Sequence, residues 1–364
     1  MGHIVGRKLR ECTGPILITG HTGFKGTWLT FLLDQLEIPS VGLSLPAIEG
    51  SLFDRSVLQG VRPEVFLDIQ DYESVSRFIN SVKPSVIFHL AAQPLVLESY
   101  SRPLETFSVN VMGTANVLDI ASKTDFVKAV VVATTDKVYR NNETGIPFVE
   151  GDPLGGKDPY SASKVAAEAV VSAWQQIVTV KGGPKIVGVR AGNVIGGGDW
   201  AVNRLIPDLA RGLMTKTTVN VRNPESTRPW QHVLDPLMGY VMTAEALLTG
   251  ENLSSLNFGP AETSMQVSEV VRIVEKIWPD SFKVEFSNTE ISRGLEAQTL
   301  GLNSNKARHS LGWTPVWSQQ EAVILTAQWW KEVIINGLSP ADVCRFDSSK
   351  FLKEFGSAKR ESRT

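Results

Sequence analysis

Cysteine is scarce in this sequence: Cys12 and Cys344 are the only two among 364 residues, and they lie near opposite ends of the chain. A framework of several disulfides is therefore excluded, and the composition is typical of a reducing compartment, so we expect a cytoplasmic protein. Cysteine, histidine and acidic residues also do not cluster at the spacings that metal ligands need. We therefore expect no bound metal.

Long apolar runs and an excess of one charge are missing as well. No stretch is long enough to cross a bilayer, and the charged first ten residues lack the apolar segment of a signal peptide behind them. Lysine and arginine number 36, aspartate and glutamate 38, and the net charge is −2. This balance argues against a general nucleic-acid binder. We expect a soluble protein with neither a membrane nor a nucleic acid as its partner.

The first half of the chain alternates short apolar runs with stretches of helical periodicity. The apolar runs predict six buried strands, at residues 15–19, 39–45, 64–68, 85–90, 128–133 and 185–190. Helical spacing predicts helices at residues 24–36, 72–82, 103–122 and 159–178. Strands joined through helices form parallel crossovers. We therefore predict an α/β fold in which residues 1–190 form a Rossmann-type, doubly wound parallel sheet.

Glycine and proline interrupt the chain more often after residue 190, at positions 196–198, 207, 224, 229 and 236. These frequent interruptions by glycine and proline predict a smaller C-terminal α+β lobe over residues 191–335, which we expect to bind the substrate. A helix at about 233–249 is predicted to return to the first domain. Residues 347–364 are charged and have little apolar content, which predicts a flexible tail.

A glycine-rich turn connects the first predicted strand to the first predicted helix. Residues 19–26 read Thr-Gly-His-Thr-Gly-Phe-Lys-Gly. Gly20 allows a tight turn, Gly23 lets a pyrophosphate approach the backbone, and Gly26 allows the helix to pack close to the strand. The helix N-terminus offers free N–H groups to phosphates. Because a strand precedes the turn and a helix follows it, the pattern favours a dinucleotide site over a plain turn.

The ends of the next two predicted strands bear on the choice of dinucleotide. Ser44 stands where such folds often carry an acid for the ribose hydroxyls. No arginine stands there to hold a 2′-phosphate, so NAD is favoured over NADP, and weak cofactor binding is a possible consequence. Asp68 ends the third strand, where it could reach the adenine or cap the following helix.

Tyr160 and Lys164 are four residues apart on a predicted helix, and therefore on one face of it. A lysine ammonium beside a phenol lowers the tyrosine pKa from its reference value of about 10. A tyrosine tuned in this way can take a proton from a sugar hydroxyl while hydride leaves the same carbon. The spacing alone is common on solvated helices, but after a glycine turn and five strands it predicts a dehydrogenase-type site.

These motifs together resemble the extended short-chain dehydrogenase/reductase family over residues 14–335. The glycine turn, the His-Leu-Ala-Ala string at 89–92, Asn110 and the Tyr160–Lys164 pair carry the resemblance. Within the family the chain is most similar to the branch that dehydrates CDP-glucose. The strings that point to this branch are Gly-Gly-Gly-Asp-Trp at 196–200 and Arg-Pro-Trp-Gln-His at 228–232.

The resemblance implies a hydro-lyase that converts CDP-D-glucose into CDP-4-dehydro-6-deoxy-D-glucose with NAD as an internal hydride carrier. It implies that Tyr160 is the base at O4, that Lys164 tunes it, and that Thr135 bonds to O4. Asp136 would be the acid for the departing O6, with its proton held by burial. Lys137 would be either the base at C5 or a cation that stabilises the enolate. The alternative for Asp136 and Lys137 is a surface ion pair.

The resemblance also implies binding residues. For NAD these are Gly20, Thr22, Gly23, Phe24, Lys25, Gly26, Ser44, Asp68, Ile69, Leu90, Ala91, Ala92, Gln93, Asn110, Tyr160 and Lys164. For the nucleotide sugar they are Gln93, Asn193, Arg204, Arg228 and His232. Each of the substrate-binding residues could instead be solvated or structural.

Other functions remain compatible with the fold. A dTDP-glucose 4,6-dehydratase or a 4-epimerase would share the glycine turn, although an epimerase has no use for an acid at O6. A non-catalytic dinucleotide sensor would not need the tyrosine, the lysine or the acid.

The chain departs from the family at Lys157, where an aromatic is usual, and at Leu295, where a histidine is usual. The resemblance further implies a homodimer or homotetramer, paired through helices 103–122 and 159–178, and a role in deoxysugar synthesis for surface polysaccharide such as lipopolysaccharide O-antigen.

Overall fold

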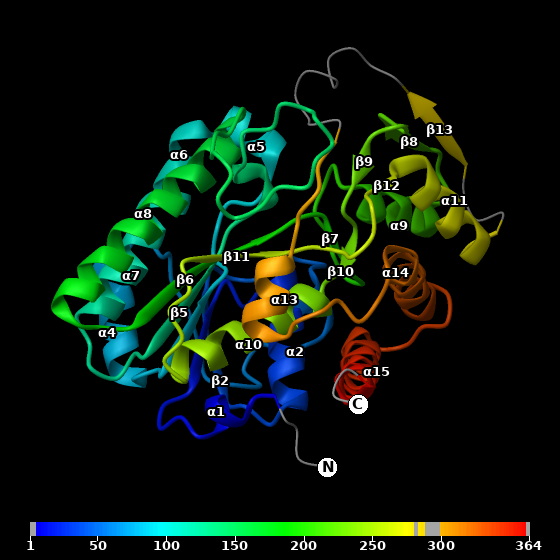
Figure 1. Cartoon of the computed structure of the whole chain (residues 1–364). Coiled ribbons are helices and arrows are strands. Elements are labelled where there is room, and N and C mark those ends of the chain that lie inside the picture. The colour runs from blue at the N-terminus through cyan, green and yellow to red at the C-terminus, as the bar shows by residue number, and fades with distance from the viewer. Residues whose placement is uncertain (1–4, 280–282, 288–298, 362–364) are drawn as a thin grey trace.

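A computed structural model describes residues 5–279, 283–287 and 299–361. Seven parallel strands form its central sheet, in the order β11-β6-β5-β4-β1-β2-β3 (Figure 1). Their bounds are β1 Ile16–Thr19, β2 Ser40–Ser44, β3 Glu64–Phe66, β4 Val86–His89, β5 Ala129–Ala133, β6 Lys185–Ala191 and β11 Ser255–Phe258. The strand order reverses between β1 and β4, which is where doubly wound sheets open a crevice for ligands. The predicted α/β fold class is confirmed.

Helices cover both faces of this sheet (Figure 1). One face packs against α4 (Tyr72–Val82), α7 (Thr114–Ser122) and α8 (Pro159–Lys181), and the other against α2 (Phe24–Gln35) and α10 (Leu234–Leu248). The strand side chains alternate between these two cores, as the period of two along a strand requires.

The first strand illustrates the alternation: Ile16 and Ile18 join the core beneath α2 and α10, whereas Leu17 joins the core beneath α4 and α7. All three side chains are buried. Burial on both faces explains why the strand is a continuous apolar run in the sequence.

The structure extends the sheet beyond the predicted boundary at residue 190. Residues 255–258 form β11, which pairs with β6 and was not predicted. The α10 helix packs against β5 and β6. The boundary at 190 is therefore wrong for the sheet, because a segment from the second half of the chain supplies its edge strand.

The predicted helix over 103–122 is divided in the structure. It consists of α6 (Pro103–Phe107), a π-helical turn at Ser108–Gly113 and α7. Asn110 lies in this turn, and Gly113 packs against Ile69, where a Cβ would lie 2.4 Å from the Ile69 Cδ1 atom. π-helical turns often occur at functional sites, where they redirect side chains.

The second lobe combines short strands and helices, which lie on the right of Figure 1. Its β-pairs are β7 with β10, β9 with β12, and β8 with β13. The bounds are β7 Val194–Ile195, α9 Leu205–Thr215, β8 Val219–Arg222, β9 Thr227–Arg228, β10 Gln231–His232, β12 Met265–Gln266, α11 Val267–Ile277, β13 Val284–Ser287 and α14 Gln319–Ile334. Short helices elsewhere are α1 Arg7–Arg10, α3 Leu52–Arg55, α5 Val96–Ser101 and α13 Asn305–Leu311, and α13 packs against β11 and α10.

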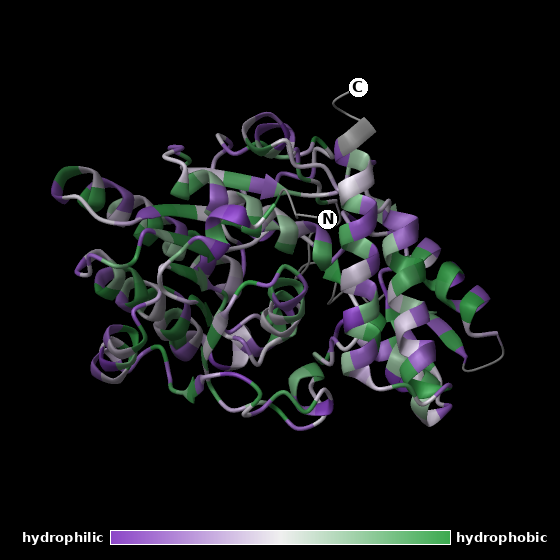
Figure 2. Ribbon diagram, turned by 90° about the horizontal axis from the view of Figure 1, so that it is seen from below, coloured by the Kyte–Doolittle hydropathy of each residue, from purple (hydrophilic) through white to green (hydrophobic). Residues whose placement is uncertain are grey.

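The predicted flexible tail is wrong for the residues that the structure describes. Pro340–Glu361 form a helix, α15, which packs against α2 and α14. Phe351 and Phe355 of this helix are buried in the main core. Figure 2 shows hydrophobic and hydrophilic residues interspersed along α15, as in a helix with one buried face. Low overall apolar content hid this face in the sequence.

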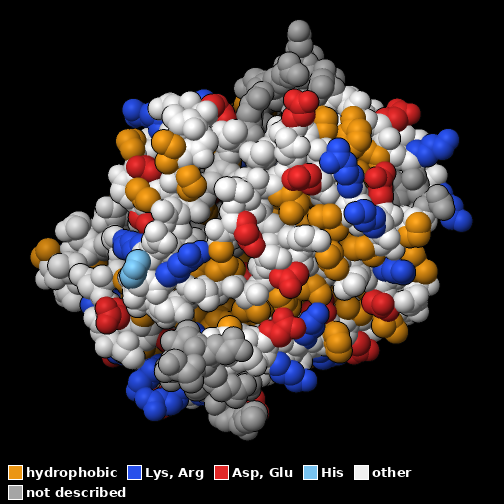
Figure 3. Space-filling view, turned by 45° about the vertical axis from the view of Figure 1, so that its right-hand side comes forward, with side chains coloured by type: hydrophobic (Ala, Val, Ile, Leu, Met, Phe, Trp, Pro, Cys, Tyr) orange, Lys and Arg blue, Asp and Glu red, His pale blue; other side chains and the backbone are white. Residues whose placement is uncertain are grey.

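The surface shows no field of a single sign on the face drawn in Figure 3, where acidic and basic side chains are intermixed. Among the described residues, no helix has both the length and the apolarity to cross a bilayer.

Candidate active site

The glycine turn is packed so closely that two of its glycines leave no room for a side chain. Gly20 has a φ of +76°, and a Cβ there would lie 2.7 Å from the backbone nitrogen of Ala91. A Cβ on Gly26 would lie 2.1 Å from the Gly20 carbonyl oxygen. Gly23 is exposed, and a Cβ there would meet only the Gly20 carbonyl oxygen, at 3.3 Å. The turn is therefore closed toward the protein and open at Gly23.

The N-terminus of α2 lies directly after this turn. No side chain caps it, and its first turn carries no acid. Its first N–H groups are thus available to an anion such as a phosphate. The Thr22 and Ser44 hydroxyls lie 2.8 Å apart, so the turn is bonded to the end of β2.

Asp68 and Ile69 lie beyond β3. The Asp68 carboxylate accepts from the backbone N–H of Gln70 at 2.9 Å. The N-cap of α4 is Asp71, which accepts from the Ser74 N–H, so the alternative role of Asp68 as that cap is wrong. The Asp68 contact to adenine stays a prediction.

The segment after β4, with Leu90, Ala91 and Ala92, is held by Asn110. The Asn110 amide oxygen accepts from the Gln93 N–H at 2.8 Å, and its nitrogen donates to the Ser163 hydroxyl at 2.8 Å. The Gln93 side chain accepts from the Leu95 N–H in its own loop and donates to the Thr106 hydroxyl of α6. Asn110 therefore links this segment to α8, and the predicted ligand contacts of both side chains stay untested.

A short turn after β5 brings three of the predicted catalytic residues together. It consists of Thr135 and the 3₁₀ helix Asp136–Val138, and we call residues 135–138 the catalytic turn. The Thr135 side chain accepts from the Lys137 N–H at the start of the helix and donates to the Asp136 carboxyl at 3.0 Å. Lys137 is half-buried. The predicted alternative of a surface ion pair is wrong, because Asp136 is buried.

The Asp136 carboxyl is the most distinctive group of this turn. Its Oδ2 atom has no hydrogen-bond partner in the structure. Gly192 lies against it, and a Cβ there would be 2.0 Å from Oδ2. Burial raises the pKa of Asp136, although Lys137, Thr135 and Arg228 act in the opposite direction. A buried carboxyl with a raised pKa and an unused oxygen can deliver a proton to a ligand.

Tyr160 and Lys164 lie on the first turns of α8, which begins in a sequence typical of helix starts. Asp158 caps the helix by accepting from the Ser161 N–H, and Pro159 is its first residue. Burial raises the pKa of Tyr160 to about 12, whereas a hydrogen bond with Thr135 and the charge of Arg204 lower it. The hydroxyl of Tyr160 thus belongs to the same cluster as the catalytic turn.

Lys164 is buried, and its ammonium donates to the carbonyl of Ala133 at 3.2 Å. Burial lowers the pKa of Lys164 to about 8, partly opposed by Glu168. The cation found to lower the pKa of Tyr160 is Arg204, from the second lobe, rather than Lys164. Tuning of Tyr160 by Lys164 remains a prediction.

Lys25 contributes a side chain to this cluster as well as a place in the glycine turn. Burial, followed by the charges of Arg204 and Lys164, lowers the pKa of Lys25 to about 8, while Asp136 raises it. Its ammonium lies 5.9 Å from the centre of the Tyr240 ring. The sequence predicted Lys25 only as an NAD-binding residue, because a turn motif does not reveal where the side chain points.

Two arginines of the second lobe face the cluster. Arg204 forms an ion pair of 2.9 Å with Asp199, whose side chain is only 6% exposed. Arg228 is buried and lowers the pKa of Asp136. Asp199 was missed, although its position in the Gly-Gly-Gly-Asp-Trp string was a signal. The two arginines bring positive charge to the cluster, which suits a phosphate ligand.

The two remaining predicted substrate contacts differ from each other. Asn193 is half-buried, with a φ of +29°, and its carbonyl accepts from the Gln231 N–H. His232 is fully buried between the Trp28 and Trp317 rings, and burial lowers the pKa of its imidazole to about 3. The side chain of His232 therefore packs in the aromatic core, and its predicted substrate contact stays a prediction.

The structure describes one of the two departures from the family pattern. Lys157 is exposed just before α8. Leu295 lies outside the described residues.

The described site unites a buried phenol, a buried carboxyl and several cations, which suits proton transfer on an anionic substrate.

Comparison with known proteins identifies the family and the fold. The sequence model of the GDP-mannose 4,6 dehydratase family matches residues 17–326. A CDP-glucose 4,6-dehydratase from Salmonella typhimurium is 41% identical over 328 residues, which cover 87% of this chain and 90% of that protein. A UDP-glucose 4-epimerase from Thermotoga maritima has the same fold, with a TM-score of 0.77 and 20% identity over 88% of this chain and 99% of that one. An NAD complex of a dTDP-glucose 4,6-dehydratase from Bacillus anthracis superposes with a TM-score of 0.74 and 21% identity, covering 88% and 97% of the two chains.

Proposed function

Since the chain belongs to the GDP-mannose 4,6 dehydratase family, within the extended short-chain dehydrogenases/reductases, we propose that it is a CDP-glucose 4,6-dehydratase. The reaction converts CDP-D-glucose into CDP-4-dehydro-6-deoxy-D-glucose and water. One observation carries the choice of dehydration: the buried Asp136 carboxyl with an unpartnered oxygen, in the same cluster as Tyr160. The 41% identical relative supports the choice of CDP-glucose.

The glycine turn fits NAD. It leaves Gly23 open, presents the uncapped N-terminus of α2, and has Ser44 rather than a cation at the end of β2. NAD, when bound, would supply the hydride acceptor for oxidation at C4 of the sugar and the hydride donor for reduction at C6. Gly23 and the first N–H groups of α2 would hold its pyrophosphate, and Lys164 would hold the ribose next to the nicotinamide.

The chain's own residues supply the proton transfers. Tyr160 takes the proton from O4, and Thr135, which lowers the pKa of Tyr160, holds the developing carbonyl at C4. The carbonyl makes the C5 proton acidic, and Lys137 is the residue we assign to C5, either as its base or as the cation that stabilises the enolate. Asp136 gives its proton to O6 as water leaves. Arg204 and Arg228 bind the pyrophosphate of the substrate.

A 4-epimerase is the second candidate, and the structure disfavours it at Asp136. Epimerisation at C4 needs a base such as Tyr160 but transfers no proton to O6. The unpartnered oxygen of Asp136, on a carboxyl that Lys137, Arg228 and Lys25 face, would then have no function, at a cost of about 1–3 kcal/mol. A dehydratase uses this oxygen in every turnover.

We further propose a homo-oligomer, with a dimer as the basic unit. Leu104 of α6 is 87% exposed, Met112 of the π-helical turn 56% and Val180 of α8 84%, and α7 packs along α8. Apolar residues on adjacent helices suit a four-helix contact with a second copy. Sedimentation that shows a monomer at micromolar concentration would exclude this assembly.

We also propose a cytoplasmic location, which the two free thiols support. The 4-keto sugar product suits further deoxysugar synthesis for surface polysaccharide.

The function is tested by incubating the purified chain separately with CDP-, dTDP-, UDP- and GDP-glucose, each with and without added NAD. The 4-keto product is followed by its absorbance in alkali and by the loss of one water in mass spectrometry. We expect product from CDP-glucose alone, with stimulation by NAD. Interconversion of glucose and galactose without loss of water would support the epimerase instead.

A further inference from the structure

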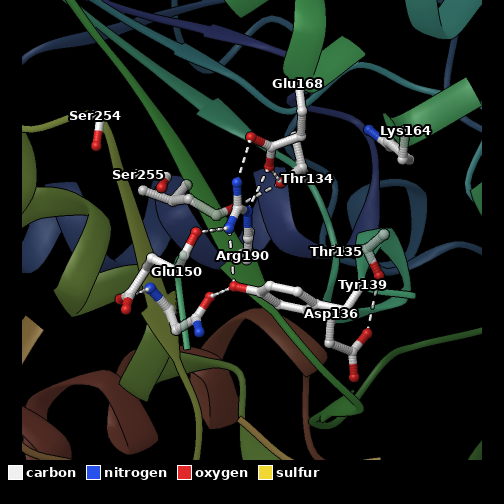
Figure 4. Close-up of polar contacts among 12 residues, drawn as sticks. Thr134, Thr135, Asp136, Tyr139, Glu150, Lys164, Glu168, Arg190, Ser254 and Ser255 are labelled. Atoms are coloured by element: carbon white, nitrogen blue, oxygen red, sulfur yellow. Dashed lines mark hydrogen bonds and ion pairs between the residues drawn. The ribbon is translucent and has the colours of Figure 1, made fainter. Parts of the chain in front are cut away.

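A buried ion pair lies directly behind the proposed catalytic residues (Figure 4). Arg190 Nε is 2.8 Å from Glu168 Oε1, and Arg190 Nη2 is 2.9 Å from Glu168 Oε2. The two side chains are only 5% and 6% exposed. Glu168 lies one helical turn beyond Lys164 on α8, and Arg190 is near the end of β6.

The same pair contacts both ends of the catalytic turn. Thr134, the residue before Thr135, donates its hydroxyl to Glu168 Oε1 at 2.5 Å. At the other end, Arg190 Nη1 donates at 2.8 Å to the hydroxyl of Tyr139, the residue after Val138. Figure 4 shows these contacts converging on the Arg190–Glu168 pair from both sides.

The surroundings satisfy and fix this arrangement. The Tyr139 hydroxyl donates to the Asn257 amide oxygen at 2.7 Å, and Arg190 also donates to the Glu150 carbonyl at 3.2 Å. A Cβ on Gly188 would lie 3.2 Å from Glu168 Oε2, so glycine leaves the room that the carboxylate occupies. A fully paired polar network of this kind rigidifies the elements that it joins.

We propose that Arg190 and Glu168 are positioning residues that hold the catalytic turn, at Thr134 and Tyr139, in register with the helix that carries Tyr160 and Lys164. The proposal rests on the proposed function only for its kinetic readout. A contribution to stability does not by itself explain a buried ion pair, because well-packed apolar residues of similar volume often stabilise a fold equally well. Position does account for it, because proton transfer to a sugar is lost when groups shift by an ångström.

Glu168 also acts through its charge. The groups that face Lys164 are Glu168 on its own helix, His89 on β4 and Lys25 on α2. Burial lowers the pKa of His89 to about 3, which leaves it neutral, and Lys25 is a cation. Glu168 thus raises the pKa of Lys164, and its loss should let Lys164 give up its proton at a lower pH.

The test uses the full chain with NAD and CDP-glucose. Thr134→Val and Tyr139→Phe each remove one link and leave the ion pair in place, so that folding is kept. We expect each to lower kcat about tenfold, while KM for CDP-glucose stays within about twofold. Glu168→Gln should lower kcat further and shift the alkaline limb of the kcat profile to lower pH. Glu168→Asp, which keeps the charge, should restore the position of that limb.

Two matched controls separate position from general damage. Thr326→Val removes a buried hydroxyl that donates to Ala322 in α14, and Arg62→Met removes the partner of Asp34 far from the site. Both should keep kcat. Hydrogen exchange of residues 134–139 in the substrate-free protein should be faster in Thr134→Val and Tyr139→Phe than in the controls.

These readouts distinguish the two claims. If the wild-type chain does not dehydrate CDP-glucose, the proposed function fails, and the exchange experiment still tests the positioning unit. If Thr134→Val and Tyr139→Phe match the controls in both kcat and exchange, the positioning proposal is overturned. A Glu168→Gln profile with an unshifted alkaline limb would overturn the effect of its charge.

Discussion

Asp136 and Asp235 are both buried carboxyls, and each has an oxygen without a hydrogen-bond partner in the structure. Their surroundings differ. Asp136 faces Lys137, Arg228 and Lys25, which act against the effect of burial on its pKa. Asp235, at the start of α10, accepts from the Val316 N–H at 2.6 Å, and burial raises its pKa to about 8.

The difference separates two regions that burial alone would not distinguish. Cations next to a buried carboxyl keep both its charged and its neutral form accessible, as an acid catalyst requires. Without cations the carboxyl stays neutral and serves as a hydrogen-bonding group of the core. The region around Asp136 is thus built for chemistry. The region around Asp235, which bonds to Trp313 and Val316 between α13 and α14, is built for stability.

Replacing Tyr160 should have the largest effect on activity. Tyr160→Phe removes the base at O4 and should lower kcat about 1,000-fold, within the range for general base catalysis. The measurement is the rate of 4-keto sugar formation from CDP-glucose. Tyr72→Phe is the control, because the Tyr72 hydroxyl bonds to Asp119 on α7, away from the site. Equal rates for the two variants would contradict the role of Tyr160.

Replacing Arg204 should affect binding and turnover together. Arg204→Met loses a charged donor for the pyrophosphate, so KM for CDP-glucose should rise roughly 10- to 100-fold. Because Arg204 lowers the pKa of Tyr160, its loss should raise that pKa, leave less phenolate at neutral pH and lower kcat about tenfold. Arg272→Met, at an exposed position of α11, should change neither quantity. A kcat equal to that of wild type in Arg204→Met would remove Arg204 from the tuning of Tyr160.

Replacing Phe351 should affect stability and leave the chemistry unchanged. Phe351→Ala opens a cavity between α15 and the core and should cost about 3–5 kcal/mol of unfolding free energy. The Tm should fall, while kcat at 25 °C stays within about twofold of wild type. Phe346→Ala is the matched control, because the Phe346 side chain lies on the same helix and is 68% exposed. A large loss of kcat in Phe351→Ala would place α15 within the functional region.

Replacing Asp235 should change only the pH dependence of stability. The folded pKa of about 8 lies above the ordinary value of 3.8, so the stability contribution of Asp235 is complete below pH 3.8 and is lost as the pH rises through 8. Asp235→Asn should therefore flatten the fall in Tm between about pH 4 and 8. Asp342→Asn, on the exposed face of α15, should leave that slope as in wild type. A wild-type slope in Asp235→Asn would mean that Asp235 is ionised in the fold.

The sequence predicted the region around Asp136 better than the region around Asp235. The buried strands and the turn at Gly20 follow local patterns, so their positions could be read from spacing. The strand β11 was missed because it is short and contains the polar residue Asn257, which interrupts the apolar run. The side chain of Asn257 is buried only because it bonds to Tyr139, which is distant in the sequence. The helix α15 was missed because its buried residues are few. The Arg204–Asp199 pair and the side chain of Lys25 depend on contacts between distant segments, which no local pattern encodes.

The assignment of Asp136 as the acid for O6 is tested most directly with a substrate whose leaving group needs no proton. CDP-6-deoxy-6-fluoro-D-glucose loses fluoride at the step where CDP-glucose loses water. We predict that Asp136→Asn lowers kcat about 100-fold on CDP-glucose but only a few-fold on the fluoro sugar, whereas Tyr160→Phe fails on both. An equal loss on the two substrates in Asp136→Asn would contradict the role of Asp136 as the proton donor.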